Sequence, residues 1–251
     1  MSILEDIVKN KQRELDGLPT LPALLTSEVS KSSVSFTDAI TRARVGIIAE
    51  IKKKSPSAGD LAGGHDLVVK AQSYEEAGAD AISVVTDQKY FGGSLQLFQD
   101  IRKATSLPML MKDFIIHPYQ VIQAEQAGAD ALLVIAALNT YFHPDLLKTL
   151  FASSITPVIE VAHTQELSLP FVQEAEIIGV NARNLNTFQI DIDRACSIIK
   201  KISKEKTVIA FSGVKSRSDV NRYKTAGAKA VLVGEILMKA KDYNLIPLLK
   251  A

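Results

Sequence analysis

The sequence predicts an α/β protein built as a single (β/α)8 TIM barrel preceded by an N-terminal helical extension. From residue 47 onward, eight short and almost wholly apolar segments alternate with stretches long enough to form helices. Parallel strands that helices cover on both faces have this composition, because neither face meets water. The length of 251 residues is typical of such a barrel. The predicted strands are residues 47–52, 81–86, 108–112, 131–136, 157–161, 176–181, 207–211 and 230–234.

An internal repeat supports this architecture. Gly78, Gly128 and Gly227 each lie in an Ala-Gly-Ala sequence between a predicted helix end and a buried strand, and a glycine in the left-handed conformation commonly ends a helix. The first two are 50 residues apart and the last two are 99 apart, so the shorter interval corresponds to about two strand–helix units. A doubly wound open sheet is the alternative, but the glycine-rich dinucleotide turn expected after its first strand is missing.

The first residues form a separate feature, because no strand is predicted before residue 47. We expect residues 1–46 to form the helical extension and residues 47–251 the barrel. An amphipathic helix is predicted over residues 2–15, and Pro19 and Pro22 follow it. A second short helix is predicted near Phe36. The apolar face of the first helix would consist of Ile3, Ile7, Val8 and Leu15.

Composition narrows the classes of function. A formal net charge of +1 gives no electrostatic sign of a nucleic-acid or membrane partner. The single cysteine, Cys196, excludes an internal disulfide, and four scattered histidines give no metal site. The N-terminus lacks the apolar core of a signal peptide, and no apolar run approaches membrane-spanning length. We therefore expect a cytoplasmic protein that is a monomer or weak homodimer and binds a small molecule.

Polar residues gather where predicted strands end, which is where the active sites of such barrels lie. Glu50 and Lys52 share one face at the end of the first strand, since strand side chains alternate. Lys53 and Lys54 are read as ordinary solvated lysines. Strand starts carry apolar residues instead, so the convergence favours a functional site. The other residues of this set are Ser55, Lys112, Glu160, Asn181, Arg183 and Ser212.

Short glycine turns after the last two strands predict a phosphate site. Gly213 follows Ser212, and Gly234 precedes Glu235. Without a Cβ atom, backbone N–H groups can approach an anion closely. Barrels commonly bind phosphate at these two loops, together with a short extra helix, which residues 235–240 could form.

With these residues in place, the chain resembles the indole-3-glycerol phosphate synthase family over nearly its whole length. The resemblance implies ring closure, decarboxylation and dehydration of 1-(2-carboxyphenylamino)-1-deoxyribulose 5-phosphate, without a cofactor or metal. It is carried by IAEIKKKSPS at 48–57, YFGGS at 90–94, PMLMKDFI at 108–115, ADALLVIAAL at 129–138, IIGVNARNL at 177–185, FSGV at 211–214 and LVGEILM at 232–238.

The resemblance also implies catalytic roles. Lys112 matches the family's general acid, which protonates the ketone oxygen. Glu50 and Glu160 match carboxylates that stabilise the cationic intermediate and take part in proton removal. Lys52 matches a lysine that contacts the substrate carboxylate and assists dehydration. Asn181 and Ser212 match catalytic residues that position the substrate and its leaving hydroxyl. The matched substrate-binding positions are Ser55, Phe91, Phe114, Arg183, Gly213, Gly234 and Glu235.

Four positions depart from the family pattern. Phe211 stands where the family usually has Glu, which removes a carboxylate near the two lysines. Ala162 stands in place of His, Ala182 in place of Asn, and Ile236 in place of a small residue. The departure at Phe211 is the most consequential, and it bears on the rate and on the pKa values of the lysines more than on the class of reaction.

Two other functions fit parts of the pattern. A Schiff-base aldolase would use Lys112 or Lys52 as a nucleophile on the ketone of a sugar phosphate. A barrel that only binds a phosphate ligand would need the anion contacts alone. The presence of both lysines together with Glu50 and Glu160 favours catalysis over simple binding.

Overall fold

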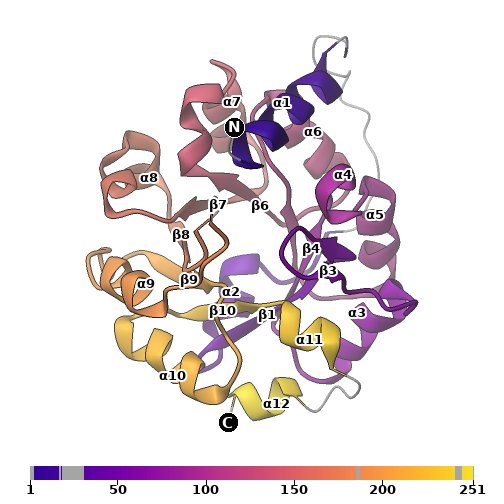
Figure 1. Cartoon of the computed structure of the whole chain (residues 1–251), viewed down its shortest axis with the longest axis vertical. Coiled ribbons are helices and arrows are strands. Elements are labelled where there is room, and N and C mark those ends of the chain that lie inside the picture. Colours follow the sequence, from indigo (N-terminus) through magenta and orange to yellow (C-terminus); the bar gives the residue numbers. More distant parts are fainter. Residues whose placement is uncertain (1–2, 17, 19–30, 185–186, 241–244, 251) are drawn as a thin grey trace.

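The eight predicted strands form a closed parallel barrel (Figure 1). The computed structural model describes residues 3–16, 18, 31–184, 187–240 and 245–250. Around the barrel the strands follow the order β1-β10-β9-β8-β7-β6-β5-β4, which is chain order apart from a small additional hairpin. The barrel strands are β1 (Gly46–Ile51), β4 (Ala81–Val85), β5 (Met109–Lys112), β6 (Ala131–Ile135), β7 (Thr156–Val161), β8 (Ile177–Asn181), β9 (Thr207–Phe211) and β10 (Ala230–Val233).

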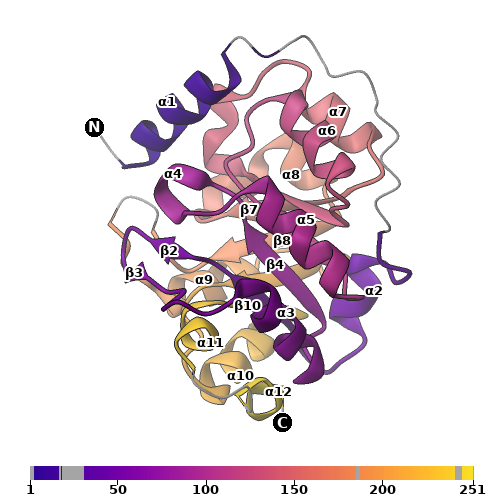
Figure 2. The same cartoon turned by 90° about the vertical axis from the view of Figure 1, so that its right-hand side faces the viewer.

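Helices surround the barrel, and shorter elements lie in the loops that follow its strands (Figures 1 and 2). The surrounding helices are α3 (Leu67–Glu76), α5 (Leu95–Ala104), α6 (Pro118–Gln126), α7 (Leu146–Ala152), α8 (Pro170–Glu174), α9 (Ile192–Ile199), α10 (Arg217–Ala226) and α12 (Leu245–Lys250). The short elements are the hairpin of β2 (Lys54–Ser55) and β3 (Gly59–Asp60), the helices α4 (Gln88–Phe91) and α11 (Glu235–Lys239), and the 3₁₀ helices η1 (Ala136–Tyr141) and η2 (Thr164–Ser168).

The alternation of strand side chains separates two hydrophobic layers. Outward-facing residues such as Ile47, Ile82 and Val180 pack with the surrounding helices. Inward-facing residues such as Ile48 and Leu133 fill the barrel interior and form a second cluster. The interior is therefore packed along most of its length, and a site has room only at the ends of the strands.

The two N-terminal helices lie at opposite ends of the barrel. Helix α2 (Phe36–Thr41) places Phe36 in the interior cluster and contacts β1 and β4, so it closes the end where the strands begin. Helix α1 (Ile3–Leu15) lies beside α4 in Figure 2. Its Lys11 is buried, with its Nζ 2.9 Å from Asp113 and 3.6 Å from Asp87 in the loops that follow β5 and β4. This charge cluster fixes α1 to the end of the barrel that carries the site.

The structure confirms the predicted barrel, with strand boundaries that differ by one residue or not at all. It confirms both N-terminal helices and the short helix after β10, observed as Glu235–Lys239. The repeated Gly78, Gly128 and Gly227 have positive φ angles, as predicted. Pro19 and Pro22 lie outside the described residues. The sequence reading missed the β2–β3 hairpin, because two-residue strands have no hydrophobic period to detect.

Candidate active site

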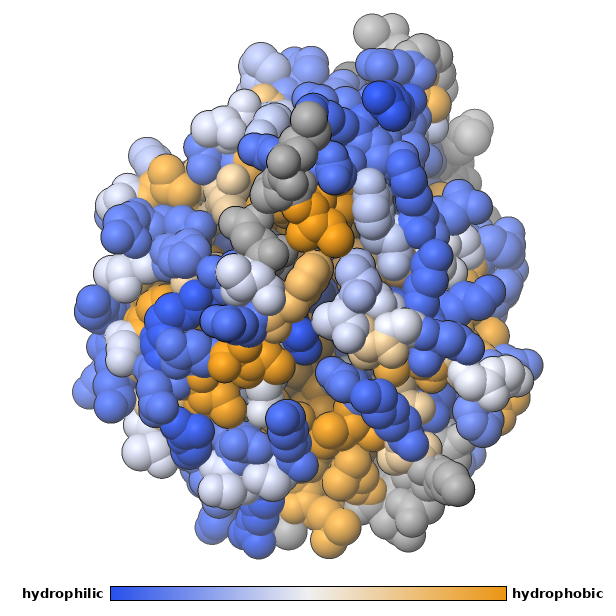
Figure 3. Space-filling view, in the orientation of Figure 1, coloured by the Kyte–Doolittle hydropathy of each residue, from blue (hydrophilic) through white to orange (hydrophobic). Residues whose placement is uncertain are grey.

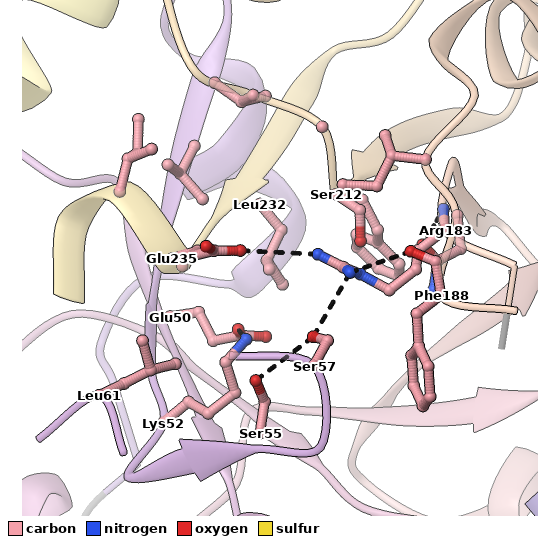
Figure 4. Close-up of a pocket in the computed structure, with 18 of the residues that line it drawn as sticks. Glu50, Lys52, Ser55, Ser57, Leu61, Arg183, Phe188, Ser212, Leu232 and Glu235 are labelled. Carbon is pink, nitrogen blue, oxygen red and sulfur yellow. Dashed lines mark hydrogen bonds and ion pairs between the residues drawn. The ribbon is translucent and has the colours of Figure 1, made fainter. Parts of the chain in front are cut away.

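A cavity of about 340 Å³ opens at the C-terminal ends of the barrel strands. The face shown in Figure 3 is hollowed near its centre, with hydrophobic residues beside the opening. Strand ends, the β2–β3 hairpin and the start of α11 contribute its walls (Figure 4). The polar and glycine residues that line it are Glu50, Lys52, Ser55, Ser57, Lys112, Asn181, Arg183, Ser212, Gly213, Lys215, Gly234, Glu235 and Lys239.

Two lysines share one buried carboxylate at the base of the cavity. Glu50 of β1 is 2% exposed, and Lys52 donates a hydrogen bond to its Oε1. Lys112, at the end of β5, has its Nζ 3.5 Å from Glu50 Oε2. Burial by itself would raise the pKa of Glu50, but the two ammonium groups outweigh it and lower the pKa to about 2. Glu50 is therefore an anion that holds two cations at the mouth of the barrel.

The second interior carboxyl has different surroundings. Glu160 of β7 is 2% exposed, and its Oε1 accepts a hydrogen bond of 2.9 Å from Asn181 Nδ2. Its Oε2 is buried and has no hydrogen-bond partner. Burial raises the pKa of Glu160, and the attraction of Lys112 opposes this without reversing it. The pKa values of Glu160 and Glu50 are thus shifted in opposite directions.

The end of β9 has an unusual backbone. Ser212 and Gly213 both have positive φ angles, 67° and 85°. Ser212 pays a conformational cost there that glycine would avoid. Tyr223 of α10 donates a hydrogen bond of 2.9 Å to the carbonyl oxygen of Ser212, which holds the turn in this conformation. The turn places both residues in the cavity wall.

Gly234 allows Glu50 to lie against the end of β10. A Cβ atom at position 234 would lie 2.4 Å from Glu50 Oε1, closer than atoms can approach without displacement. The glycine is therefore needed by the carboxylate of the lysine cluster. This is a reason for the glycine that differs from the predicted phosphate contact, which stays a prediction.

Arg183 lies across the mouth of the cavity (Figure 4). Its Nη2 is 3.7 Å from Glu235 Oε2, and its Nη1 donates to the carbonyl oxygen of Phe188 and to Ser57 Oγ at 3.2 and 3.5 Å. It therefore links the β8 loop to the β2–β3 hairpin and to the start of α11. A hydrogen bond from Lys239 lowers the pKa of Glu235, so this carboxylate is also an anion.

All but two of the residues predicted from the sequence line this one cavity. Phe114 and Glu160 do not line it. Phe114 packs against Phe91 with 6.0 Å between ring centroids, so it supports a wall from behind. Glu160 is hydrogen-bonded to Asn181, which does line the cavity, so its carboxyl lies directly behind the wall. Lys53 and Lys54 line no part of the cavity, and their alkyl chains pack near Gly92, in keeping with their interpretation as ordinary lysines.

The sequence reading missed most of the apolar wall, because an isolated apolar residue carries no signal of a pocket. The family pattern marks Phe211 and Ile236 as departures, but it does not predict that they line a pocket. The wall residues that were missed as pocket residues are Leu61, Phe188, Ile190, Phe211, Val214, Leu232, Val233 and Ile236.

The closed parallel barrel, with a cation-lined cavity at the C-terminal ends of its strands, defines an enzyme of the (β/α)8 class. Within the described ranges, no group of three or more His, Cys, Asp or Glu residues is placed to hold a metal ion. The described helices also include none that is long and apolar enough to span a membrane.

Comparison with known proteins gives the family. The family model described as indole-3-glycerol phosphate synthase matches residues 4–246, so the chain belongs to this family. Proteins named indole-3-glycerol phosphate synthase from Bacillus cereus (strain AH820) and Bacillus anthracis (strain A0248) are 38% identical over 246 residues. These alignments cover 97% of this chain and 95% of each relative.

Solved structures of lower identity share the fold alone. A thiamine phosphate pyrophosphorylase from Pyrococcus furiosus superimposes with a TM-score of 0.59 at 13% identity, covering 83% of this chain and 95% of that chain. A 3-hexulose-6-phosphate synthase superimposes with a TM-score of 0.62 at 15% identity, covering 82% of this chain and 98% of the other.

Proposed function

We propose that this protein is an indole-3-glycerol phosphate synthase, a carboxy-lyase of tryptophan biosynthesis. It would close the ring of 1-(2-carboxyphenylamino)-1-deoxyribulose 5-phosphate with loss of carbon dioxide and water. Family membership supports the reaction. The structural observation that carries the proposal is that Lys52 and Lys112 both pair with one buried carboxylate, that of Glu50.

The proposed mechanism begins at Lys112, whose ammonium donates a proton to the ketone oxygen as the aromatic carbon attacks. Ring closure develops positive charge on the ring system, and the fixed anion of Glu50 stabilises it. Lys52 contacts the carboxylate of the substrate and assists the later loss of water. Glu160 accepts the proton that is lost as the indole forms.

The remaining predicted residues would bind and orient the substrate. Asn181 and Ser212 position the reacting atoms and the leaving hydroxyl, and both line the cavity. Gly213 and Gly234 lie at the ends of β9 and β10, where barrels commonly bind phosphate. Arg183 and Ser55 supply polar contacts at the mouth. Phe91, supported by Phe114, gives an apolar wall for the aromatic ring.

The geometry favours this reaction over the two other candidates. A Schiff-base nucleophile attacks the carbonyl as a neutral amine, whereas Lys52 and Lys112 are both placed to form ion pairs with Glu50. A protein that only binds a phosphate ligand would have no use for the buried carboxyl of Glu160.

Turnover tests the proposal directly. The purified protein is incubated with the anthranilate-derived ribulose phosphate, and the fluorescence of indole-3-glycerol phosphate is followed. Lys112→Ala is expected to abolish product while circular dichroism shows a folded protein. Lys148→Ala, at an exposed lysine of α7, is the matched control. Unchanged turnover in Lys112→Ala would refute the assignment of the acid, and a borohydride-trapped substrate adduct would favour the aldolase.

We further propose that the protein acts in the cytoplasm as a monomer or weak homodimer and without a nucleic-acid partner. The net charge of +1 supports the absence of a polyanionic partner. We also propose that residues 1–46 and 47–251 act as one domain, since Lys11 of the extension pairs with carboxylates of the barrel loops. Sedimentation velocity over a range of concentrations measures the oligomeric state.

A further inference from the structure

Phe211 is the one aromatic residue in the eight barrel strands as the structure bounds them. It is 1% exposed and belongs to the interior cluster, at the end of β9. Its ring fills a space left by a glycine of the neighbouring strand: a Cβ atom at Gly179 would lie 2.3 Å from Phe211 Cε2 and 2.6 Å from Cζ. The edge of the ring that carries Cε2 and Cζ therefore occupies the place that a side chain at position 179 would take.

This position places the ring beside Glu160. Gly179 of β8 pairs in register with Glu160 of β7, and Glu160 points into the interior as Phe211 does. Because Gly179 has no side chain, nothing from β8 separates the aromatic ring from the carboxyl at that level. Asn181, two residues further along β8, donates a hydrogen bond to the carboxyl and lines the cavity.

The Glu160 carboxyl has few polar contacts. It accepts one hydrogen bond, from Asn181, and its other oxygen is buried without a hydrogen-bond partner. Among the described residues, no Lys, Arg or His nitrogen lies within 4.0 Å of it, and Lys112 approaches Glu50 instead. A buried carboxylate anion without a cation or a full set of hydrogen bonds is strongly unfavourable, so these surroundings favour the protonated form.

We propose that Phe211 is a positioning residue that excludes water from Glu160 and keeps this carboxyl protonated in the resting protein, while Glu50 remains an anion. The role of Phe211 in catalysis rests on the proposed function, whereas its effect on the protonation of Glu160 does not. The charged groups that act on Glu160 are Lys112, which favours ionisation, and Glu50 and Glu166, which oppose it. Burial is the largest of these effects and raises the pKa of Glu160.

The proton on Glu160 can be accounted for in the proton balance of the proposed reaction. Ring closure forms a carbon–carbon bond and adds one proton to the ketone oxygen. Breaking the bond to the carboxylate releases carbon dioxide and returns the electron pair to the ring system. The hydroxyl then leaves as water with a second proton, and one proton is lost from the adjacent carbon.

Two protons are therefore added and one is removed, so each turnover consumes one proton. A protonated Glu160 would hold the proton that leaves with the hydroxyl as water. Lys112 would deliver the proton that is added to the ketone oxygen. Once ionised, Glu160 is the base that accepts the proton lost from carbon. This sequence reconciles a neutral Glu160 at rest with its role in proton removal.

Infrared difference spectroscopy of the protein alone tests the inference without reference to activity. Wild-type protein at neutral pH is expected to show the carbonyl stretch of a protonated carboxyl, and Glu160→Gln should lack it. Phe211→Gln, which brings a polar amide beside the carboxyl, should lower the titration midpoint of this band by about one pH unit or more. Phe211→Leu, which is apolar, should retain the band at neutral pH.

Two further variants complete the design. Phe171→Gln makes the same substitution at a buried phenylalanine of α8 and should leave the band unchanged. If Phe211→Gln does not fold, Phe211→Tyr keeps the ring and adds a hydroxyl that can donate to the buried oxygen, with the same expected direction. Absence of a Glu160-dependent band in wild-type protein at neutral pH overturns the inference, as does an unchanged midpoint in the polar variants.

The pH profile of kcat/KM links the inference to catalysis. Its alkaline limb should move to lower pH in Phe211→Gln together with the infrared midpoint. If the infrared shifts occur but wild-type protein shows no turnover of the proposed substrate, the proposed function fails and the role of Phe211 stands. If turnover is normal and the infrared band is absent, the role of Phe211 fails and the proposed function stands.

Discussion

Glu50→Gln should remove most of the acid sensitivity that Glu50 brings to the fold. The pKa of this carboxyl falls from an ordinary value of 4.5 to about 2, because the attraction of Lys52 and Lys112 exceeds the opposing effect of burial. Each pKa unit corresponds to about 1.4 kcal/mol, so the ionised group contributes about 3 kcal/mol to the free energy of unfolding. All three side chains are mostly buried, so solvent screens the pairs little.

The direction of the pH dependence follows from the lowered pKa. The contribution of Glu50 is complete above its unfolded value near 4.5 and is lost as the pH falls toward about 2. Glutamine has the shape of a protonated glutamate, so the variant should match wild type near about pH 2. At neutral pH the variant should be less stable by about 3 kcal/mol.

Urea unfolding at a series of pH values measures this difference. Glu174→Gln is the control, since this glutamate of α8 is exposed and distant from the lysines. The free energy of unfolding of wild type should fall with decreasing pH more steeply than that of Glu50→Gln, while the control should follow wild type. Parallel curves for wild type and Glu50→Gln would show that the two ammonium groups do not stabilise the buried carboxylate.

Three further substitutions test the packing around the site. Gly234→Ala places a Cβ atom 2.4 Å from Glu50 Oε1 and should lower turnover at least about tenfold in a folded protein; normal turnover would mean that Glu50 can move at no cost. Lys11→Met leaves Asp87 and Asp113 without their shared cation and should lower the free energy of unfolding in urea by about 3–5 kcal/mol. A decrease below about 1 kcal/mol would show that α1 does not depend on this cluster. Gly93→Ala directs a Cβ atom to within 2.0 Å of a carbonyl oxygen of β4 and should cost about 1–3 kcal/mol, seen as a lower Tm; an unchanged Tm would mean that the α4 loop shifts freely.

The alternation of buried strands and helices was readable from sequence because it depends on local composition. The strand ends at Glu50, Lys112 and Asn181 were placed on one rim because parallel strands point the same way. The β2–β3 hairpin was not predicted, since strands of two residues have no hydrophobic period to detect. Phe114 was predicted as a substrate-binding residue from the resemblance, and Glu160 first from its place at a strand end, whereas the structure places both just outside the cavity.

The sequence by itself determined the barrel, its C-terminal rim and the residues that gather there, because side-chain parity and strand direction follow from backbone geometry. Only the tertiary structure decided which of the two buried carboxyl groups the lysines contact. Two cations lie near Glu50 and none lies within 4.0 Å of Glu160 in the described residues. Such differences depend on distances of a few ångströms between strands far apart in the chain, where Coulomb and desolvation energies change steeply.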